Sequence, residues 1–460
     1  MSGTITLLAL IQLLGATGSD SRAAIPLASS QQLLHGGRSQ EAQQGQPAAL
    51  PVDHPGEVPD VTGDLGVRFA ALPRRDASDF DLWAGVRATN APGARLRWHT
   101  DIRLEGLLAN RDGFAGDFRA DVREAWVEGK IGAADLRAGF GRLPWGRLDE
   151  IQPTDLINPL DTSRLLLDGR SEARRAVGFV RARLTPSEKL RFEGVLVPFF
   201  RRGVFDALDE DSSPFNLTRD AVLPAIPLAE DGRVDHRRPD VRFSNVSGGG
   251  RVDATIGRVD VGVAAYRGFD AFGPIVFETS VTAPTPPSVT PSVAGQLVEF
   301  HPRFTMIGGD FETVTGEWAW RGEAAAIVER TFAGVSRVGL VRGRSLDAGA
   351  GFDRRAGEFR VYGSVLLHRD WSNEDPAITR TNTSLVGSIE RRFDRDRWLA
   401  RAFAVVNPAD RSGFVRGLAT WTPRDHVAID MSAGAFLGTG DDTISRFKGR
   451  DFVLLGVRVF

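Results

Sequence analysis

The stretch 95-RLRWHTDIRLEGLL-108 alternates between two kinds of side chain. One register holds Leu96, Trp98, Thr100, Ile102, Leu104, Gly106 and Leu108, and the other holds Arg95, Arg97, His99, Asp101, Arg103 and Glu105. A period of two places these registers on opposite faces of a β-strand. One face therefore suits hydrocarbon and the other suits water.

The segment 358–368 repeats this pattern. Its apolar register is Phe359, Val361, Gly363, Val365 and Leu367, and its polar register is Arg360, Tyr362, Ser364 and His368. Leu366 is the one apolar residue among the polar set. Because two distant segments share the same two-faced pattern, we expect them to belong to one sheet.

Eighteen segments of strand length follow the first 60 residues. They are 62–72, 79–90, 95–109, 116–131, 134–143, 174–185, 188–199, 242–256, 258–268, 297–313, 316–330, 344–354, 357–368, 382–393, 396–407, 412–422, 425–436 and 449–460. Every second connection is a tight turn, such as 91–93, 132–133 or 257, and the others include long loops, such as 144–173, 200–241 and 269–296. Short turns at one rim and long loops at the other are typical of membrane barrels.

The sequence therefore predicts an all-β fold, a transmembrane antiparallel up-and-down β-barrel of about 18 strands, with 16 as the next choice. An even count returns the carboxyl terminus to the periplasmic side. A soluble β-sandwich also has alternating strands. The long and short connections follow each other around the whole count, which favours the barrel.

Aromatic residues near predicted strand ends fit membrane interfaces, which favour such side chains. They are Phe80, Trp318, Trp398, Phe414, Trp421 and Phe436. The chain ends on Phe460, and a terminal phenylalanine after an alternating strand resembles the signal that the barrel assembly machinery reads. We expect that machinery and outer-membrane lipids to be partners.

Composition excludes several classes of protein. The chain of 460 residues has no cysteine, so it has no disulfide framework and no thiolate metal site. A net charge of −2 gives no concentrated basic surface for nucleic acid. The longest apolar stretch, Ile5 to Leu14, is shorter than the roughly 20 residues that a membrane helix needs.

The amino-terminal part divides into two segments before the barrel. Residues 1–23 are expected to be a signal peptide, with a disordered tail as the alternative. Residues 24–60 are rich in Gln, Ser, Pro, Gly and Ala and predict a flexible periplasmic linker. The barrel then occupies 61–460, and the predicted location is the cell outer membrane.

The most distinctive local sequence follows the fifth predicted strand, within residues 123–170. Glycines and prolines between about 144 and 160 prevent a regular element there, so we expect a loop folded into the lumen. Its predicted constriction residues are Arg142, Trp145, Arg147, Asp149, Asp155, Asp161 and Arg164. Charges at such a place narrow and polarise a channel. The alternative is that this loop only braces the wall.

This region also resembles a known family. The run Gly141-Arg142, Trp145-Gly146, Asp149, Pro153-Thr154-Asp155 and Asn158-Pro159-Leu160-Asp161 is similar to the G-R-Q…W-G…D…N-P…D stretch of Gram-negative porin-like outer-membrane barrels. Leu143 stands where that family often has Gln. The resemblance implies an outer-membrane channel, and some members of the family accompany exporters of lipids or hydrophobic compounds.

Other chemistry has weak support. The acidic run Asp206, Asp209, Glu210 and Asp211 and the segment 438-GTGDD-442 lack the ligand spacing of a calcium loop. The seven histidines are scattered, and no G-x-S-x-G elbow is present. We expect no cofactor, no metal and no catalytic residue. An outer-membrane hydrolase, whose site is assembled across strands, stays open as an alternative.

The predicted function is a porin-like channel for passive passage of small solutes through a charged lumen. The predicted lumen-wall residues are Arg97, Asp101, Arg103, Glu105, Arg191 and Glu193. A barrel that moves hydrophobic compounds or lipids with periplasmic or inner-membrane exporter components is the main alternative. A third hypothesis is a structural or adhesive barrel whose loops plug the pore. The oligomeric state is left open, and a homo-oligomer is one option.

Overall fold

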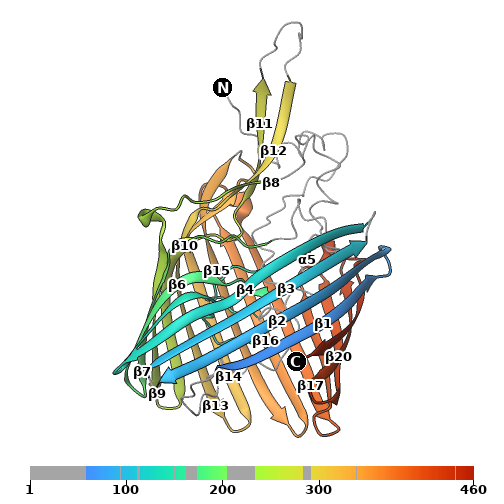
Figure 1. Cartoon of the computed structure of the whole chain (residues 1–460). Coiled ribbons are helices and arrows are strands. Elements are labelled where there is room, and N and C mark those ends of the chain that lie inside the picture. The colour runs from blue at the N-terminus through green and yellow to red at the C-terminus, as the bar shows by residue number, and fades with distance from the viewer. Residues whose placement is uncertain are drawn as a thin grey trace.

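The chain forms a closed β-barrel (Figure 1). The computed structural model describes residues 59–93, 95–110, 114–149, 151–161, 173–204, 234–282, 292–337, 339–440 and 442–460. The signal peptide and nearly all of the linker predicted from the sequence lie outside these residues. The barrel strands are β1 (Asp60–Leu72), β2 (Ala77–Gly93), β3 (Leu96–Asn110), β4 (Phe114–Ile131), β5 (Ala134–Gly141), β6 (Val177–Ser187), β7 (Leu190–Val197), β9 (Ser247–Ile256), β10 (Val259–Phe269), β13 (Arg303–Thr315), β14 (Trp318–Ala333), β15 (Leu340–Ala356), β16 (Phe359–Trp371), β17 (Arg380–Phe393), β18 (Trp398–Asn407), β19 (Ser412–Arg424), β20 (Val427–Leu437) and β21 (Phe452–Val459).

Eighteen antiparallel strands confirm the predicted architecture. Each strand pairs with its neighbour along the chain, and β1 pairs with β21 from Leu65↔Val459 to Ala71↔Val453. This last pairing closes the sheet and leaves no free edge. The tight turns from β4 to β5 and from β9 to β10 lie at the lower rim in Figure 1, and they contain Gly132 and Gly257, both at positive φ.

The two faces of the barrel differ in polarity as the alternation predicted. Large apolar side chains point outward and are exposed, including Leu104, Val263 and Leu455. Inward positions hold buried charged residues such as Asp101 and Arg137. Exposed apolar side chains around a closed sheet, with polar side chains inside, define a membrane-spanning barrel, and the protein is therefore located in the cell outer membrane. Separately, none of the helices in the described ranges has the length and apolar character of a membrane span.

Three additional strands lie outside the barrel wall. They are β8 (Val234–Arg237), β11 (Ile275–Thr282) and β12 (Ser292–Phe300), and β11 and β12 extend beyond the upper end of the barrel in Figure 1. The prediction of one strand over 297–313 is corrected here. The chain leaves β12 at His301-Pro302 and begins β13 at Arg303, because proline has no N–H to continue a ladder.

The aromatic prediction is wrong for two phenylalanines, whereas Phe80 and the three tryptophans lie near strand ends in the outward register. Trp398 stacks on Trp421 with ring centroids 5.5 Å apart, close to the turns of the lower rim. Phe414 and Phe436 are instead buried inside the barrel, where they stack on each other at 4.7 Å. Phe436 also contacts Phe447, which follows the short helix α5 (Thr443–Arg446), so this inner cluster fixes the last long connection.

Candidate functional site

The segment between β5 and β6 is called the insert below, and its described residues, 142–149, 151–161 and 173–176, pack against the inner wall of the barrel. Asn158 clamps its two ends together. The Asn158 side chain accepts a hydrogen bond from the Leu143 N–H at 2.6 Å and donates to the carbonyls of Gly141 and Arg175. Arg174 donates to the Asp155 carboxylate at 2.8 Å. The insert is therefore internally braced before it meets the wall.

One buried carboxylate, Glu323 of β14, holds the middle of the insert. It accepts hydrogen bonds from the backbone N–H groups of Arg147, Leu148 and Thr154 at 2.9, 3.2 and 2.6 Å, and from the Thr154 hydroxyl at 2.7 Å. Gly146 makes this approach feasible. Its φ is +102°, and a Cβ at this position would lie 2.5 Å from Glu323 Oε1.

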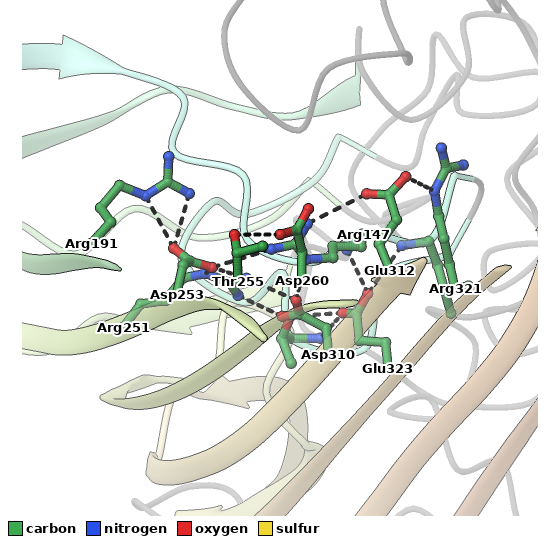
Figure 2. A network of polar contacts seen from close by, with 12 residues as sticks. Arg147, Arg191, Arg251, Asp253, Thr255, Asp260, Asp310, Glu312, Arg321 and Glu323 are labelled. Carbon is green, nitrogen blue, oxygen red and sulfur yellow. Dashed lines mark hydrogen bonds and ion pairs between the residues drawn. The ribbon is translucent and has the colours of Figure 1, made fainter. Parts of the chain in front are cut away.

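The Arg147 side chain joins the insert to an alternating row of charges on the wall (Figure 2). Its guanidinium donates to Asp310 at 2.6 Å and lies 3.5 Å from Asp253. Arg251 bridges the same two carboxylates, at 2.6 Å from Asp310 and 2.7 Å from Asp253. Arg191 reaches Asp253 from β7 at 2.9 Å. Opposite charges therefore alternate from β7 through β9 and β13 to the insert.

The row continues on the other side of Arg147. Glu312 lies 3.4 Å from Arg147 and 2.9 Å from Arg321, and Arg321 donates to Asp149 at 2.8 Å. Asp149 also lies 3.6 Å from Arg360 of β16. The insert thus bridges strands from β9 to β16 across the inner wall.

Apolar contacts add to these ion pairs. Leu148 is fully buried in a cluster with Tyr362 and Leu366 of β16. A Cβ on Gly349 would lie 2.6 Å from Leu366 and 2.7 Å from Leu148, so the glycine opens the space that the two leucines fill. Leu366, the apolar exception in the polar register of its strand, is therefore a contact point for the insert.

Trp145, also on the insert, is buried against the inner wall of the barrel. Its indole N–H donates to Glu193 of β7 at 2.9 Å, and its ring meets Tyr266 of β10 edge to face at 6.2 Å. Trp145, Arg147 and Asp149 thus lie together on the inner wall.

The other predicted constriction residues have partners outside the charge row around Arg147. Arg142 faces Glu124 at 3.8 Å, Asp155 pairs with Arg174 inside the insert, and Asp161 lies 3.6 Å from Arg119. Arg164 falls outside the described residues.

All six predicted lumen-wall residues belong to the inward register. Arg97 pairs with Glu128 at 2.9 Å, Asp101 lies 3.5 Å from Arg87, and Arg103 lies 3.4 Å from Glu105. The two residues on β7 meet partners from neighbouring segments, Arg191 with Asp253 and Glu193 with both Arg183 and Trp145. The structure thus forms two groups, one on β2–β4 and one beside the insert.

Four wall partners of the insert were not predicted from the sequence, namely Glu323, Asp310, Asp253 and Arg251. Their only local signal is a charged side chain at an inward position of a strand, and many other inward positions share it. Leu366 was the better indicator, because an apolar residue on a water-facing register needs a partner.

The described residues give little support to the hypotheses of a hydrolase site or a metal site. Ser345 donates to Asp370 at 2.5 Å, while His368 contacts Asp347 and Asp370. A serine activated by histidine is not formed among these residues. Within the described ranges no group of three metal-ligating side chains is assembled, and Asp442 caps α5. Residues 206–211 fall outside the described part.

Asp375, in the loop between β16 and β17, organises a neighbouring loop. It accepts hydrogen bonds from the Val335 and Ser336 N–H groups at 2.7 and 2.9 Å. Burial acts to raise the pKa of Asp375, but these bonds and those from the Ser336 hydroxyl and the Ala377 N–H outweigh it and hold the pKa below its ordinary value. A lowered pKa stabilises the loop above the pKa of the unfolded chain, and this contribution is lost as pH falls through the folded value.

We therefore expect Asp375→Asn to increase amide hydrogen exchange at Val335 and Ser336 at neutral pH, by roughly fivefold or more since charge-assisted bonds become neutral ones. The difference from wild type shrinks as the pH falls below the lowered pKa. Asp451→Asn, in a different upper loop, is the control. Equal exchange in wild type and Asp375→Asn at neutral pH contradicts the role given to this carboxylate.

A closed eighteen-strand barrel with an apolar outer face, a charged inner face and an inward-folded segment is a transmembrane β-barrel of the outer membrane. No protein-family model and no curated protein matches the sequence. Among solved structures, the chain is similar to Pseudomonas aeruginosa OccK5 (OpdH), with 9% identity over 87% of this chain and 97% of that chain and a TM-score of 0.47. It is also similar to a BenF-like porin from Pseudomonas fluorescens Pf-5 (9% identity, 87% and 97% covered, TM-score 0.46) and to Salmonella typhi OmpF (8%, 87% and 97%, 0.41). The count of eighteen strands and the closure of the barrel rest on the strand pairing of this chain and not on these similarities.

Proposed function

We propose that this protein is a passive channel through which small solutes diffuse along a charged lumen, with the insert as its selectivity element. The observation that carries the proposal is the alternating charge row around Arg147, which joins the insert to the inner wall. Fixed charges of both signs at a narrowing favour hydrated polar solutes over apolar ones.

Transport of hydrophobic compounds or lipids has less support. That function calls for an apolar lumen or a lateral gap between strands. The inner face is charged, and each barrel strand is hydrogen-bonded to two neighbours, including the β1–β21 closure.

Single-channel conductance of the purified, refolded protein in a planar bilayer tests the proposal. We expect discrete steps for wild type, and larger steps after deletion of residues 144–170, by roughly twofold because the narrowing element is removed. The control is deletion of residues 283–291, which connect β11 to β12 in the sequence, because neither of these strands belongs to the barrel wall. Absence of steps in both wild type and the 144–170 deletion contradicts the channel, and unchanged steps in that deletion contradict the role of the insert.

A further inference from the structure

Arginines gather on the outer surface of one side of the barrel, at its upper rim. They are Arg267 of β10, Arg303 of β13, Arg342 and Arg344 of β15, and Arg369 of β16, called the outer arginine patch below. Each shares the register of exposed, outward-facing apolar residues on its strand, such as Val263, Ile307 and Val365. The patch therefore faces the membrane and not the lumen.

The outward positions at the upper ends of the other described strands are different. Among the described residues they carry no charge except on Glu329 of β14, and examples are Ser78, Leu108, Asn110, Phe114, Thr381 and Leu437. The chain as a whole has nearly equal numbers of basic and acidic residues, 57 and 59. Its overall composition therefore does not account for five arginines on one side of one rim. The patch is a local feature of the strands from β10 to β16.

Carboxylates balance this patch only in part. Arg267 pairs with Glu329 at 2.8 Å, and Arg303 lies over the Phe269 ring at 4.4 Å. The Glu374 carboxylate accepts a hydrogen bond from the Arg342 N–H at 2.8 Å. In the described part of the chain, no carboxylate forms an ion pair with the guanidinium group of Arg342, Arg344 or Arg369, and all three side chains are exposed. The patch thus keeps a positive excess toward the membrane.

The lower rim provides a contrast on the same side of the barrel, on β15 and β17. There Arg354 of β15 pairs with Glu317 at 3.0 Å, and Arg391 of β17 pairs with Glu358 at 2.5 Å. Outward arginines at the lower rim are thus neutralised by carboxylates of the protein, whereas those at the upper rim are left to bind another anion.

Neighbouring side chains set the depth of the patch in the membrane. Arg344 pairs with Trp371 in the β15–β16 register, and the Arg369 guanidinium lies 5.9 Å from the centre of the Trp371 ring. Aromatic side chains of this kind lie at the boundary between hydrocarbon and headgroups. Val365 and Leu367 are exposed further down the same strand and face hydrocarbon. The guanidinium groups therefore reach the headgroup level of the outer leaflet.

We propose that the outer arginine patch binds the phosphate groups of a phosphorylated lipid in the outer leaflet. Guanidinium groups match phosphate oxygens in a bidentate geometry, and several on adjacent strands suit a headgroup with more than one phosphate. The exposed apolar residues below them contact its acyl chains. This site lies on the opposite side of the barrel wall from the lumen, so it is independent of channel activity.

Native mass spectrometry of the detergent-solubilised barrel with diphosphorylated lipid A tests this site. The variant is Arg344→Gln/Arg369→Gln, and the matched control is Arg354→Gln/Arg391→Gln, which removes the same charge from the lower rim. We expect wild type and control to retain the lipid, and the upper-rim variant to bind it at least about tenfold more weakly. Monophosphorylated lipid A should bind wild type less tightly than the diphosphorylated form.

Two results overturn the proposal. One is equal lipid binding by the upper-rim variant and the control. The other is full displacement of the lipid by inorganic phosphate at equal concentration, which makes the patch a simple anion site. Heat-dependent mobility on gels shows whether each variant is folded, so loss of binding is distinguished from loss of the barrel.

Discussion

Glu323→Ala is expected to release the insert and raise the single-channel conductance, roughly twofold, with larger current fluctuations than wild type. The carboxylate accepts four hydrogen bonds from the insert, and its removal leaves these donors without an acceptor. Each unmet buried donor costs about 1–3 kcal/mol, although such costs are not additive. The backbone ladders that close the barrel do not involve this side chain, so the barrel itself should persist.

Three further variants define the cause. Glu323→Gln keeps one carbonyl oxygen, so its conductance should fall between those of wild type and Glu323→Ala. Gly146→Ala should resemble Glu323→Ala, because its methyl group would lie 2.5 Å from the carboxylate and its φ is +102°. Glu317→Ala removes an exposed glutamate at the turn before the same strand and should leave conductance unchanged. Wild-type conductance in both Glu323→Ala and Gly146→Ala contradicts the anchoring role.

Much of the barrel could be predicted because strand faces and turns are local properties. A period of two, as in residues 95–108, is readable within one strand, and many of the tight turns carry glycine or proline in the sequence itself. The error over 297–313 has the same origin. Alternation continues across His301-Pro302, and only the pairing of β12 with β11 and β8 shows that the first half leaves the wall.

The wall partners of the insert could not be predicted in this way. Arg147 and Asp310 are separated by 163 positions, and Arg147 and the Glu323 carboxylate by 176. Which inward charge meets the insert depends on the path that the insert takes across the barrel, and no local period encodes that path. The sequence therefore locates one half of the site, and the fold supplies the other half.

Arg147→Gln is expected to shift ion selectivity toward cations. The substitution removes a positive charge that lies within 3.5 Å of Asp310, Asp253 and Glu312. Arg251 still bridges the two aspartates, so the wall keeps its fold while the negative potential beside the insert increases. Two unit charges about 4 Å apart interact by about 4 kcal/mol at an effective dielectric constant of 20, and salt screening reduces this in a wet lumen.

A remaining effect near 1 kcal/mol corresponds to about a fivefold rise in the ratio of K⁺ to Cl⁻ permeability. The reversal potential in a KCl gradient measures this ratio directly, and Arg147→Lys, which keeps the charge, should stay close to wild type. Arg391→Gln removes an arginine from the outer face and serves as the matched control. If Arg147→Gln leaves the reversal potential unchanged while Arg251→Gln shifts it, ions pass beside β9 and not beside the insert. If neither variant moves it, the charge row lies outside the conduction path and acts only as a brace.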